Sequence, residues 1–162
     1  MTLMLPVGMS QVHTFPLSVH WSGSTLGAGE YSRDAVAQSP GKPMIVTSAA
    51  PSYNGNAARW NPEDMFGAAL ATCHMLTFFA LAKKAGIDVQ AYDDNAVATL
   101  EMVDKAMRIS TIKLAPTIVV AAGTNEAAVR ELFDKAHKHC FVTNSVTTRV
   151  ELVPTVVVGG GR

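Results

Sequence analysis

The chain carries two cysteines whose surroundings favour chemistry over packing alone. Cys73 is followed directly by His74 in an otherwise apolar segment, and Cys140 follows the His-Lys-His triplet of residues 137–139. The reactive form of a thiol is the thiolate, and cysteine with an ordinary pKa of about 8.5 is mostly protonated at neutral pH. A reactive cysteine in this chain therefore needs a nearby cation or dipole that stabilises its negative charge.

The segment around Cys73 predicts one long helix. Asn61 suits the N-cap, Pro62 suits the first helical position, and Gly86 is placed to end the helix. Nearly every residue from 65 to 82 is apolar or Thr, so we expect protein on all sides of the helix. The apolar run also approaches the length of a membrane span, but the central Cys-His pair favours a core helix in a protein that does not enter the membrane.

The position of Cys73 in this helix limits how its thiol can be activated. It lies ten residues inside the helix, and the effect of the helix dipole fades after the first turn. Burial alone would raise its pKa, so a positive partner must come from elsewhere in the fold. The candidates are the arginines Arg33, Arg59, Arg108, Arg130 and Arg149, together with the five histidines of the chain.

A carboxylate in the first turn of the same helix is a second candidate site residue. Glu63 could hold an arginine side chain in place through a bidentate pair. However, ten residues of helix separate Glu63 from Cys73 by roughly 15 Å and by a rotation of about 280°. Both can belong to one site if the helix is interrupted or if a second subunit supplies Glu63, and we favour a homodimer with symmetry-related sites. Alternatively, Glu63 only complements the helix dipole.

The segments before this helix predict short strands and a loop. Residues 11–21 and 26–31 predict an N-terminal hairpin, because they are separated by a Ser- and Gly-containing turn. Residues 39–59 contain three prolines and two glycines, which predicts a loop with a short strand near residues 44–47.

The segments after the helix complete an α+β pattern. Residues 95–103 and 108–121 are rich in Val, Ile, Thr and Leu, which favours an antiparallel pair of strands. Asn125 then caps a second, amphipathic helix that ends near Cys140. Residues 146–158 predict a last strand with an interruption at its proline.

Length and charge limit the class of protein. With 162 residues and a formal charge of zero, the chain fits one domain and offers no basic surface for nucleic acid. We expect a single domain over residues 11–158, a disordered segment over residues 1–10 and a frayed tail over residues 159–162. Met9 is an alternative start of translation.

The predicted location of the protein is the cytoplasm. The first residues lack the positive region of a signal peptide and are interrupted at Pro6. In a reducing compartment, two cysteines are free, catalytic or redox-active more often than they form a permanent disulfide. No Gly-rich phosphate-binding loop is present in the sequence, and we expect no cofactor.

Several motifs of the chain resemble those of one known family. Asn61-Pro-Glu, Cys73-His-Met-Leu-Thr-Phe and His137-Lys-His-Cys140, followed by Asn144-Ser145, resemble the osmotically inducible protein C (OsmC) family and its organic hydroperoxide resistance (Ohr) relatives. The resemblance runs from about residue 21 to residue 153. It implies an intertwined α+β homodimer, with antiparallel sheets around two long central helices and with sites at the subunit interface.

The resemblance also implies an activity and a role for each candidate residue. It implies a cysteine-based thiol peroxidase that reduces organic hydroperoxides, and hydrogen peroxide less well. Cys73 resembles the peroxidatic cysteine and Cys140 the resolving cysteine. Glu63 resembles the glutamate that pairs with a catalytic arginine, for which we expect Arg33, with Arg59 as the alternative. An external dithiol, such as a lipoyl-bearing protein, would reduce the resulting disulfide.

Two other functions are compatible with the same residues. The first is a metal site, although its candidate ligands lack the paired spacing of structural zinc sites. The second is a non-enzymatic dimer of the same fold that binds a small apolar molecule and whose cysteines only pack; its Cys73 would not react with peroxide. The candidate metal ligands are His74, His137, His139, Cys73 and Cys140.

Overall fold

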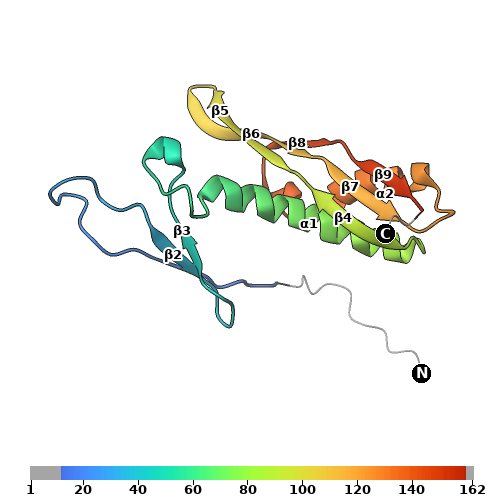
Figure 1. Ribbon diagram of the computed structural model, residues 1–162, viewed down its shortest axis with the longest axis horizontal. Helices are drawn as coiled ribbons and strands as arrows, with labels where there is room; N and C mark the ends of the chain where they lie inside the picture. The colour runs from blue at the N-terminus through green and yellow to red at the C-terminus, as the bar shows by residue number, and fades with distance from the viewer. Residues whose placement is uncertain (1–11, 160–162) are drawn as a thin grey trace. The chain divides into compact units, whose positions relative to one another are not determined.

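The computed structural model describes residues 12–159, and the chain divides into two compact units at Trp60 and Asn61 (Figure 1). The domain predicted for residues 11–158 therefore contains two such units. The segment predicted to be disordered, residues 1–10, lies outside the described residues, as do residues 160–162 of the predicted tail. Gly159 is not frayed, because its N–H donates to the carbonyl oxygen of Val120 at 3.1 Å.

The N-terminal unit is built on a small antiparallel sheet. Its strands are β1 (Ser18–His20), β2 (Ala35–Gln38) and β3 (Ile45–Thr47), in the order β1-β2-β3. A 3-10 turn, η1 (Pro51–Tyr53), follows within the loop that was predicted from its prolines and glycines. The short strand predicted near residues 44–47 is confirmed as β3.

The predicted N-terminal hairpin is wrong in its second strand. β1 pairs with β2, whereas residues 26–31 belong to the loop between these two strands. Leu26 is 95% exposed, and Gly29 has a φ of +87°, which is not a strand conformation. Glycines in this segment provide no side chains to pack across a sheet, so the pairing passes to the β-branched residues further along. Of the first predicted strand, only Ser18–His20 pairs, and Gln11 lies outside the described residues.

The C-terminal unit begins with the predicted helix, α1 (Pro62–Lys84). The Asn61 side chain accepts a hydrogen bond from the N–H of Asp64 at 2.8 Å, and the Asp64 carboxylate accepts from the N–H of Asn61 at 3.3 Å. This reciprocal capping box fixes the start of the helix. Gly86 follows the last turn with a φ of +72°, the left-handed conformation that favours glycine after a helix.

Only one face of α1 is fully buried. Leu70, His74, Phe78 and Ala82 form a stripe with a spacing of four residues, while Leu76 is 56% exposed. The prediction that protein covers the helix on all sides is therefore wrong for the chain by itself, because one helix and two small sheets cover only one side. By length and composition α1 could cross a membrane, but its buried stripe packs into a protein core, as predicted.

Strands of the C-terminal unit form two sheets in the orders β5-β6-β8 and β4-β7-β9. β8 pairs with β6 in parallel, and β9 pairs with β7 in parallel. The pairs β5–β6 and β4–β7 are antiparallel. Figure 1 shows α1 running along these strands. Their bounds are β4 (Val89–Asp94), β5 (Val97–Val103), β6 (Ala106–Leu114), β7 (Pro116–Val120), β8 (Arg149–Leu152) and β9 (Thr155–Val158).

The two sheets meet where three stretches of chain change direction together. Asp94 ends β4, and its carboxylate accepts a hydrogen bond from the N–H of Ala115, at the break between β6 and β7, at 2.9 Å. The break between β8 and β9 contains Pro154, which has no N–H to donate. The predicted antiparallel pair is confirmed as β5 and β6, but the second strand predicted for residues 108–121 is divided at Ala115 into β6 and β7 of different sheets. Its sharp turn is made by Asp104 and Lys105, both with positive φ.

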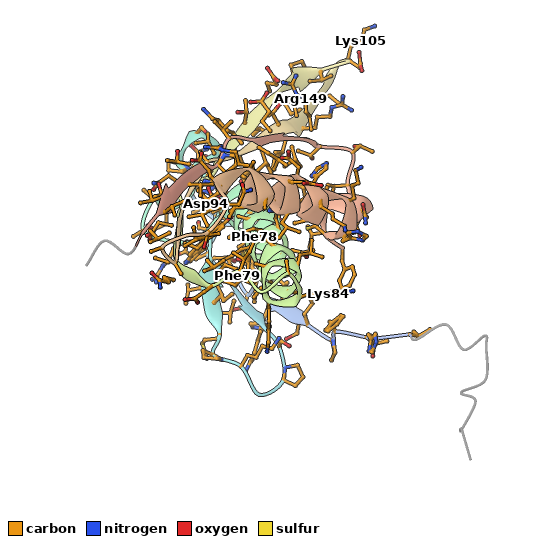
Figure 2. All side chains as sticks on the ribbon, turned by 90° about the vertical axis from the view of Figure 1, so that its right-hand side faces the viewer. Phe78, Phe79, Lys84, Asp94, Lys105 and Arg149 are labelled. Carbon is orange, nitrogen blue, oxygen red and sulfur yellow. The ribbon has the colours of Figure 1, made fainter. Side chains whose placement is uncertain are left out.

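The second helix, α2 (Glu126–His139), is confirmed with its predicted cap. Asn125 accepts hydrogen bonds from the N–H groups of Ala127 and Ala128 at 2.9 and 3.3 Å. The buried face of α2 packs on α1, where the rings of Phe133 and Phe78 lie 5.5 Å apart. Figure 2 shows Phe78 on α1 next to α2. The predicted α+β fold class is confirmed.

Candidate active site

Packing of α1 against α2 brings the two cysteines together. The ring of His74, next to Cys73, lies 4.4 Å from the ring of Phe133 and 6.4 Å from that of His137. Cys140 follows one turn after His137, at the C-cap of α2. Both thiols are free; Cys140 is fully buried and Cys73 is half-buried. Cys73 is thus the more accessible thiol of the two.

A tight turn after α2 holds the sulfur of Cys140. The N–H of Asn144 donates to the carbonyl oxygen of Cys140 at 3.0 Å, and the hydroxyl of Ser145 donates to the carbonyl oxygen of Phe141 at 2.7 Å. These bonds shape the 3-10 turn η2 (Thr143–Ser145). They place the N–H of Thr143 at 3.5 Å from the Sγ of Cys140, which is therefore held in one position.

The surroundings of Cys73 favour its thiolate. Burial raises the pKa of Cys73, but hydrogen bonds to the sulfur from Cys140 and from the N–H groups of Val142 and Phe141 outweigh this effect. The pKa of Cys73 is therefore lowered from its ordinary value, because hydrogen bonds to a charged form stabilise that form.

The opposite holds for Cys140. Burial raises the pKa of Cys140, and its hydrogen bond to Cys73 raises it further, because the proton of the pair stays on Cys140. The negative charge of the Cys73 thiolate acts in the same direction. The pair is thus asymmetric, because the pKa of Cys73 is lowered and that of Cys140 is raised, which makes Cys73 the more nucleophilic thiol of the two.

Glu63 lies far from Cys73 within its own chain. α1 is continuous from Pro62 to Lys84, so the two residues remain roughly 15 Å apart and an interrupted helix is ruled out. One carboxylate oxygen of Glu63, Oε2, is buried and has no hydrogen-bond partner among residues 12–159. Buried carboxylate oxygens are nearly always paired, so an unpaired oxygen at this position is uncommon in a folded chain.

Both candidate arginines belong to the N-terminal unit, whereas the cysteines belong to the C-terminal unit. Arg33 forms an ion pair with Glu30 at 2.8 Å and donates to the carbonyl oxygen of Tyr31 at 2.6 Å. Its guanidinium also stacks 4.1 Å above the Tyr31 ring. Arg59 is exposed in the turn before α1. The role of each arginine stays a prediction.

Sequence reasoning missed the groups that surround the two sulfurs. Thr77 lies one helical turn after Cys73, a spacing that could have identified it, because residues four apart share a helix face. Its hydroxyl donates to the carbonyl oxygen of Cys73 at 2.8 Å. The N–H groups of Phe141 and Val142 carry no sequence signal, since every residue except proline has one.

The alternative metal site is not assembled in this part of the chain. Within residues 12–159, no set of three or more His, Cys, Asp or Glu side chains is placed to hold a metal ion. The ring of His74 is instead part of the core between the two helices. Its burial, followed by the charge of His137, lowers the pKa of His74 to about 4.

Comparison with known proteins agrees with the fold. Residues 55–154 match the family model for OsmC-like proteins. An OsmC-like protein of unknown function from Vibrio cholerae (VCA0330) is 30% identical, with a TM-score of 0.79, covering 90% of this chain and 100% of that structure. The organic hydroperoxide resistance protein of Elizabethkingia anophelis is 19% identical, with a TM-score of 0.68, covering 93% and 99% of the two chains.

A curated relative is also similar. The uncharacterized protein YmaD of Bacillus subtilis is 22% identical over 143 residues, which cover 86% of this chain and 91% of YmaD. The expected resemblance is confirmed by the family match over more than half of the sequence. The chain is therefore a member of the OsmC-like protein family.

Proposed function

We propose that the protein is a cysteine-based peroxidase that reduces organic hydroperoxides. The observation that carries this proposal is the asymmetric pair of Cys73 and Cys140, in which the pKa of Cys73 is lowered and that of Cys140 is raised. Structural neighbours of the same fold include proteins named for organic hydroperoxide resistance. Exposed Phe141 directly follows Cys140 and offers apolar surface to an organic substrate.

In the first step, the Cys73 thiolate attacks the distal oxygen of the hydroperoxide. A sulfur–oxygen bond forms and the oxygen–oxygen bond breaks, so the sulfur is oxidised by two electrons to a sulfenic acid. The peroxide is reduced, and its alkoxide takes up a proton and leaves as an alcohol. Hydrogen peroxide would react in the same way and release water.

In the second step, Cys140 resolves the sulfenic acid. The sulfur of Cys140 loses its proton and attacks the Cys73 sulfur, a disulfide forms, and the hydroxyl group leaves as water. An external dithiol then reduces the disulfide by thiol–disulfide exchange and becomes oxidised itself. A lipoyl-bearing protein is one dithiol of suitable chemistry.

We propose that the working form is a homodimer. The exposed apolar face of α1, marked by Leu76, provides a surface for a second copy. The unpartnered Glu63 oxygen would then find its arginine in an arrangement completed by the partner. Arg33, oriented by Glu63, would add positive charge near Cys73, with Arg59 as the alternative. We expect this dimer to work in the cytoplasm.

The direct test is consumption of cumene hydroperoxide and of hydrogen peroxide by the reduced protein with a dithiol supplied. We expect turnover of the organic peroxide by the wild-type protein and none by Cys73→Ser. Cys140→Ser should stop at the sulfenic acid when the dithiol is limiting. Negligible consumption by all three proteins would overturn the proposal and favour a non-enzymatic dimer that binds a small apolar molecule.

A further inference from the structure

The end of the loop between β1 and β2 holds the guanidinium of Arg33 in one orientation. Its Nη1 donates to the carboxylate of Glu30 at 2.8 Å and to the carbonyl oxygen of Tyr31 at 2.6 Å. The guanidinium also stacks on the Tyr31 ring, with its central carbon 4.1 Å from the ring centroid. As a result the Arg33 side chain is only 17% exposed, although it lies on a loop. These contacts restrict a side chain that otherwise has many rotamers.

A second aromatic residue fixes the Tyr31 ring and closes the loop at its base. Trp21 directly follows β1, and its indole N–H donates to the carbonyl oxygen of Ser32 at 2.8 Å. The rings of Trp21 and Tyr31 meet edge to face, with 6.3 Å between their centroids. A Cβ added at Gly23 would lie 2.9 Å from the Trp21 ring, so the ring rests directly on the backbone of the loop. Both rings stay partly exposed, so the packing of a core does not explain why they lie against Arg33.

The contacts of Arg33 leave one edge of its guanidinium free. Both of its hydrogen bonds use Nη1. Within residues 12–159, its Nε and Nη2 donate no hydrogen bond, although a guanidinium has five N–H donors in a fixed geometry. Two parallel N–H groups of this kind can bind both oxygens of one carboxylate. Arg33 is therefore held on one side and is available to a carboxylate on the other.

The cavity beside Arg33 favours a carboxylate that the protein itself supplies. Arg33 lines a cavity of about 400 Å³ together with the polar residues Ser48 and Asn56. Glu30 and Asp34 line the same cavity, so its charged groups are one cation and two carboxylates. This excess of negative charge repels a free anion. A carboxylate that is already fixed on the protein loses less freedom on binding, so it is the better ligand for this edge.

Resting on the proposed function, we propose that Tyr31 and Trp21 are positioning residues of the reaction. They hold Arg33 so that its Nε–Nη2 edge receives the carboxylate of Glu63. This prepared orientation lowers the entropy cost of ordering a long side chain when the pair forms. Glu30 contributes less, because it is 77% exposed and ion pairs at exposed positions are weak. Both aromatic residues act through Arg33.

The first test measures how fast phenylglyoxal modifies the guanidinium of Arg33, by peptide mapping with mass spectrometry. We expect Tyr31→Leu to speed this modification by about threefold, because the stacking on the ring is lost. Tyr31→Phe keeps the ring and should stay near the wild-type rate. Tyr53→Leu, at a similarly exposed tyrosine of the same unit, is the matched control. Equal rates at Arg33 in Tyr31→Leu and Tyr53→Leu would overturn the anchoring.

A variant at the other aromatic residue keeps the test informative if Tyr31→Leu does not fold. Trp21→Phe retains a ring next to Tyr31 but loses the N–H that donates to Ser32. It should also speed the modification of Arg33, because the base of the loop is no longer closed. A wild-type rate at Arg33 in Trp21→Phe would contradict the role of Trp21.

The second test shows whether the anchoring serves the reaction. Tyr31→Leu should lower kcat/KM for cumene hydroperoxide by about threefold or more in the wild-type background. The same substitution should have no further effect in Arg33→Gln, because residues that act through one another are not additive. An equal loss in both backgrounds would overturn the positioning role, since the effect would then be independent of Arg33.

The two tests separate this inference from the peroxidase function on which it rests. Modification by phenylglyoxal requires no peroxide. If the wild-type protein consumes no peroxide while Arg33 reacts faster in Tyr31→Leu, the proposed function is overturned and the anchoring of Arg33 stands. If the wild-type protein is an active peroxidase and Tyr31→Leu changes neither rate, the anchoring is overturned and the proposed function stands.

Discussion

His74 gives the protein a dependence on acid that is separate from its thiol chemistry. The ring is fully buried between α1 and α2, and burial, followed by the charge of His137, lowers its pKa from 6.5 to about 4. The folded state therefore binds fewer protons than the unfolded state between these values. His74 therefore leaves the free energy of unfolding unchanged above pH 6.5 and decreases it as the pH falls towards 4.

This linkage predicts the behaviour of a variant. The difference between 6.5 and 4 corresponds to an upper limit of about 3 kcal/mol of unfolding free energy at low pH. His74→Leu should remove most of this loss, as measured by urea unfolding between pH 7.5 and 4.5. His20→Gln, at an exposed position of β1, is the matched control and should keep the wild-type dependence. If the unfolding free energy of His74→Leu depends on pH as steeply as that of the wild type, His74 is not the cause of the dependence.

Substitutions of single residues can show whether Arg33 or Arg59 is the partner of Glu63. Lysine keeps the positive charge but cannot form the bidentate pair with a carboxylate. If Arg33 is the partner of Glu63, Arg33→Lys should slow peroxide reduction by about tenfold or more, and Glu63→Gln should do the same. Arg59→Lys is the control and should change the rate little. The reverse pattern for the two lysine variants would assign the role to Arg59.

At the scale of elements, the bend shared by the two sheets depends on Asp94. Burial raises the pKa of Asp94, while the hydrogen bond from the N–H of Ala115 lowers it, and the net direction is upward. Asp94→Asn keeps an acceptor for this N–H and should leave the stability near that of the wild type. Asp94→Ala leaves the donor unpaired and should destabilise the protein by about 1–3 kcal/mol, as measured by urea unfolding. Equal stability of the two variants would show that the bend does not need this bond.

Sequence reasoning was most successful for elements with strong local signals. Asn61 and Asn125 predicted the starts of both helices, because capping depends on a few adjacent residues. The prediction of the strand that pairs with β1 failed, because the true partner is distant in sequence and the nearer candidate was a glycine-containing segment. The parallel addition of β8 and β9 was also missed, because a local pattern gives no information on the order of strands.

In the candidate site, too, features with a local sequence signal could be predicted and features that depend on the folded chain could not. Cys73 and Cys140 were identified by residue type and by family resemblance, and the structure brings them together. The backbone donors of Phe141 and Val142 could not be predicted, because they result from the shape of one turn. The positions of Arg33 and Glu63 in a shared site stay predictions, since the two residues belong to different units of the chain.

At the scale of the whole molecule, the exposed face of α1 predicts a dimer. Leu76 lies opposite the buried stripe, at a position that a partner helix would cover. Leu76→Glu would bury a charge in that interface and should weaken dimerisation by at least about tenfold. Light scattering coupled to gel filtration measures this effect, with Lys135→Glu on the exposed face of α2 as the control. A Leu76→Glu protein that stays as dimeric as the control would contradict this interface.

The proposed peroxidase function requires that Cys73 and Cys140 form one redox pair. It is tested most directly by adding one equivalent of cumene hydroperoxide to the fully reduced protein and mapping the cysteines by mass spectrometry without reduction. We expect a peptide pair linked by a Cys73–Cys140 disulfide, with a loss of about two hydrogen masses per chain. Recovery of both cysteines as unmodified thiols, with the peroxide unconsumed, would contradict it.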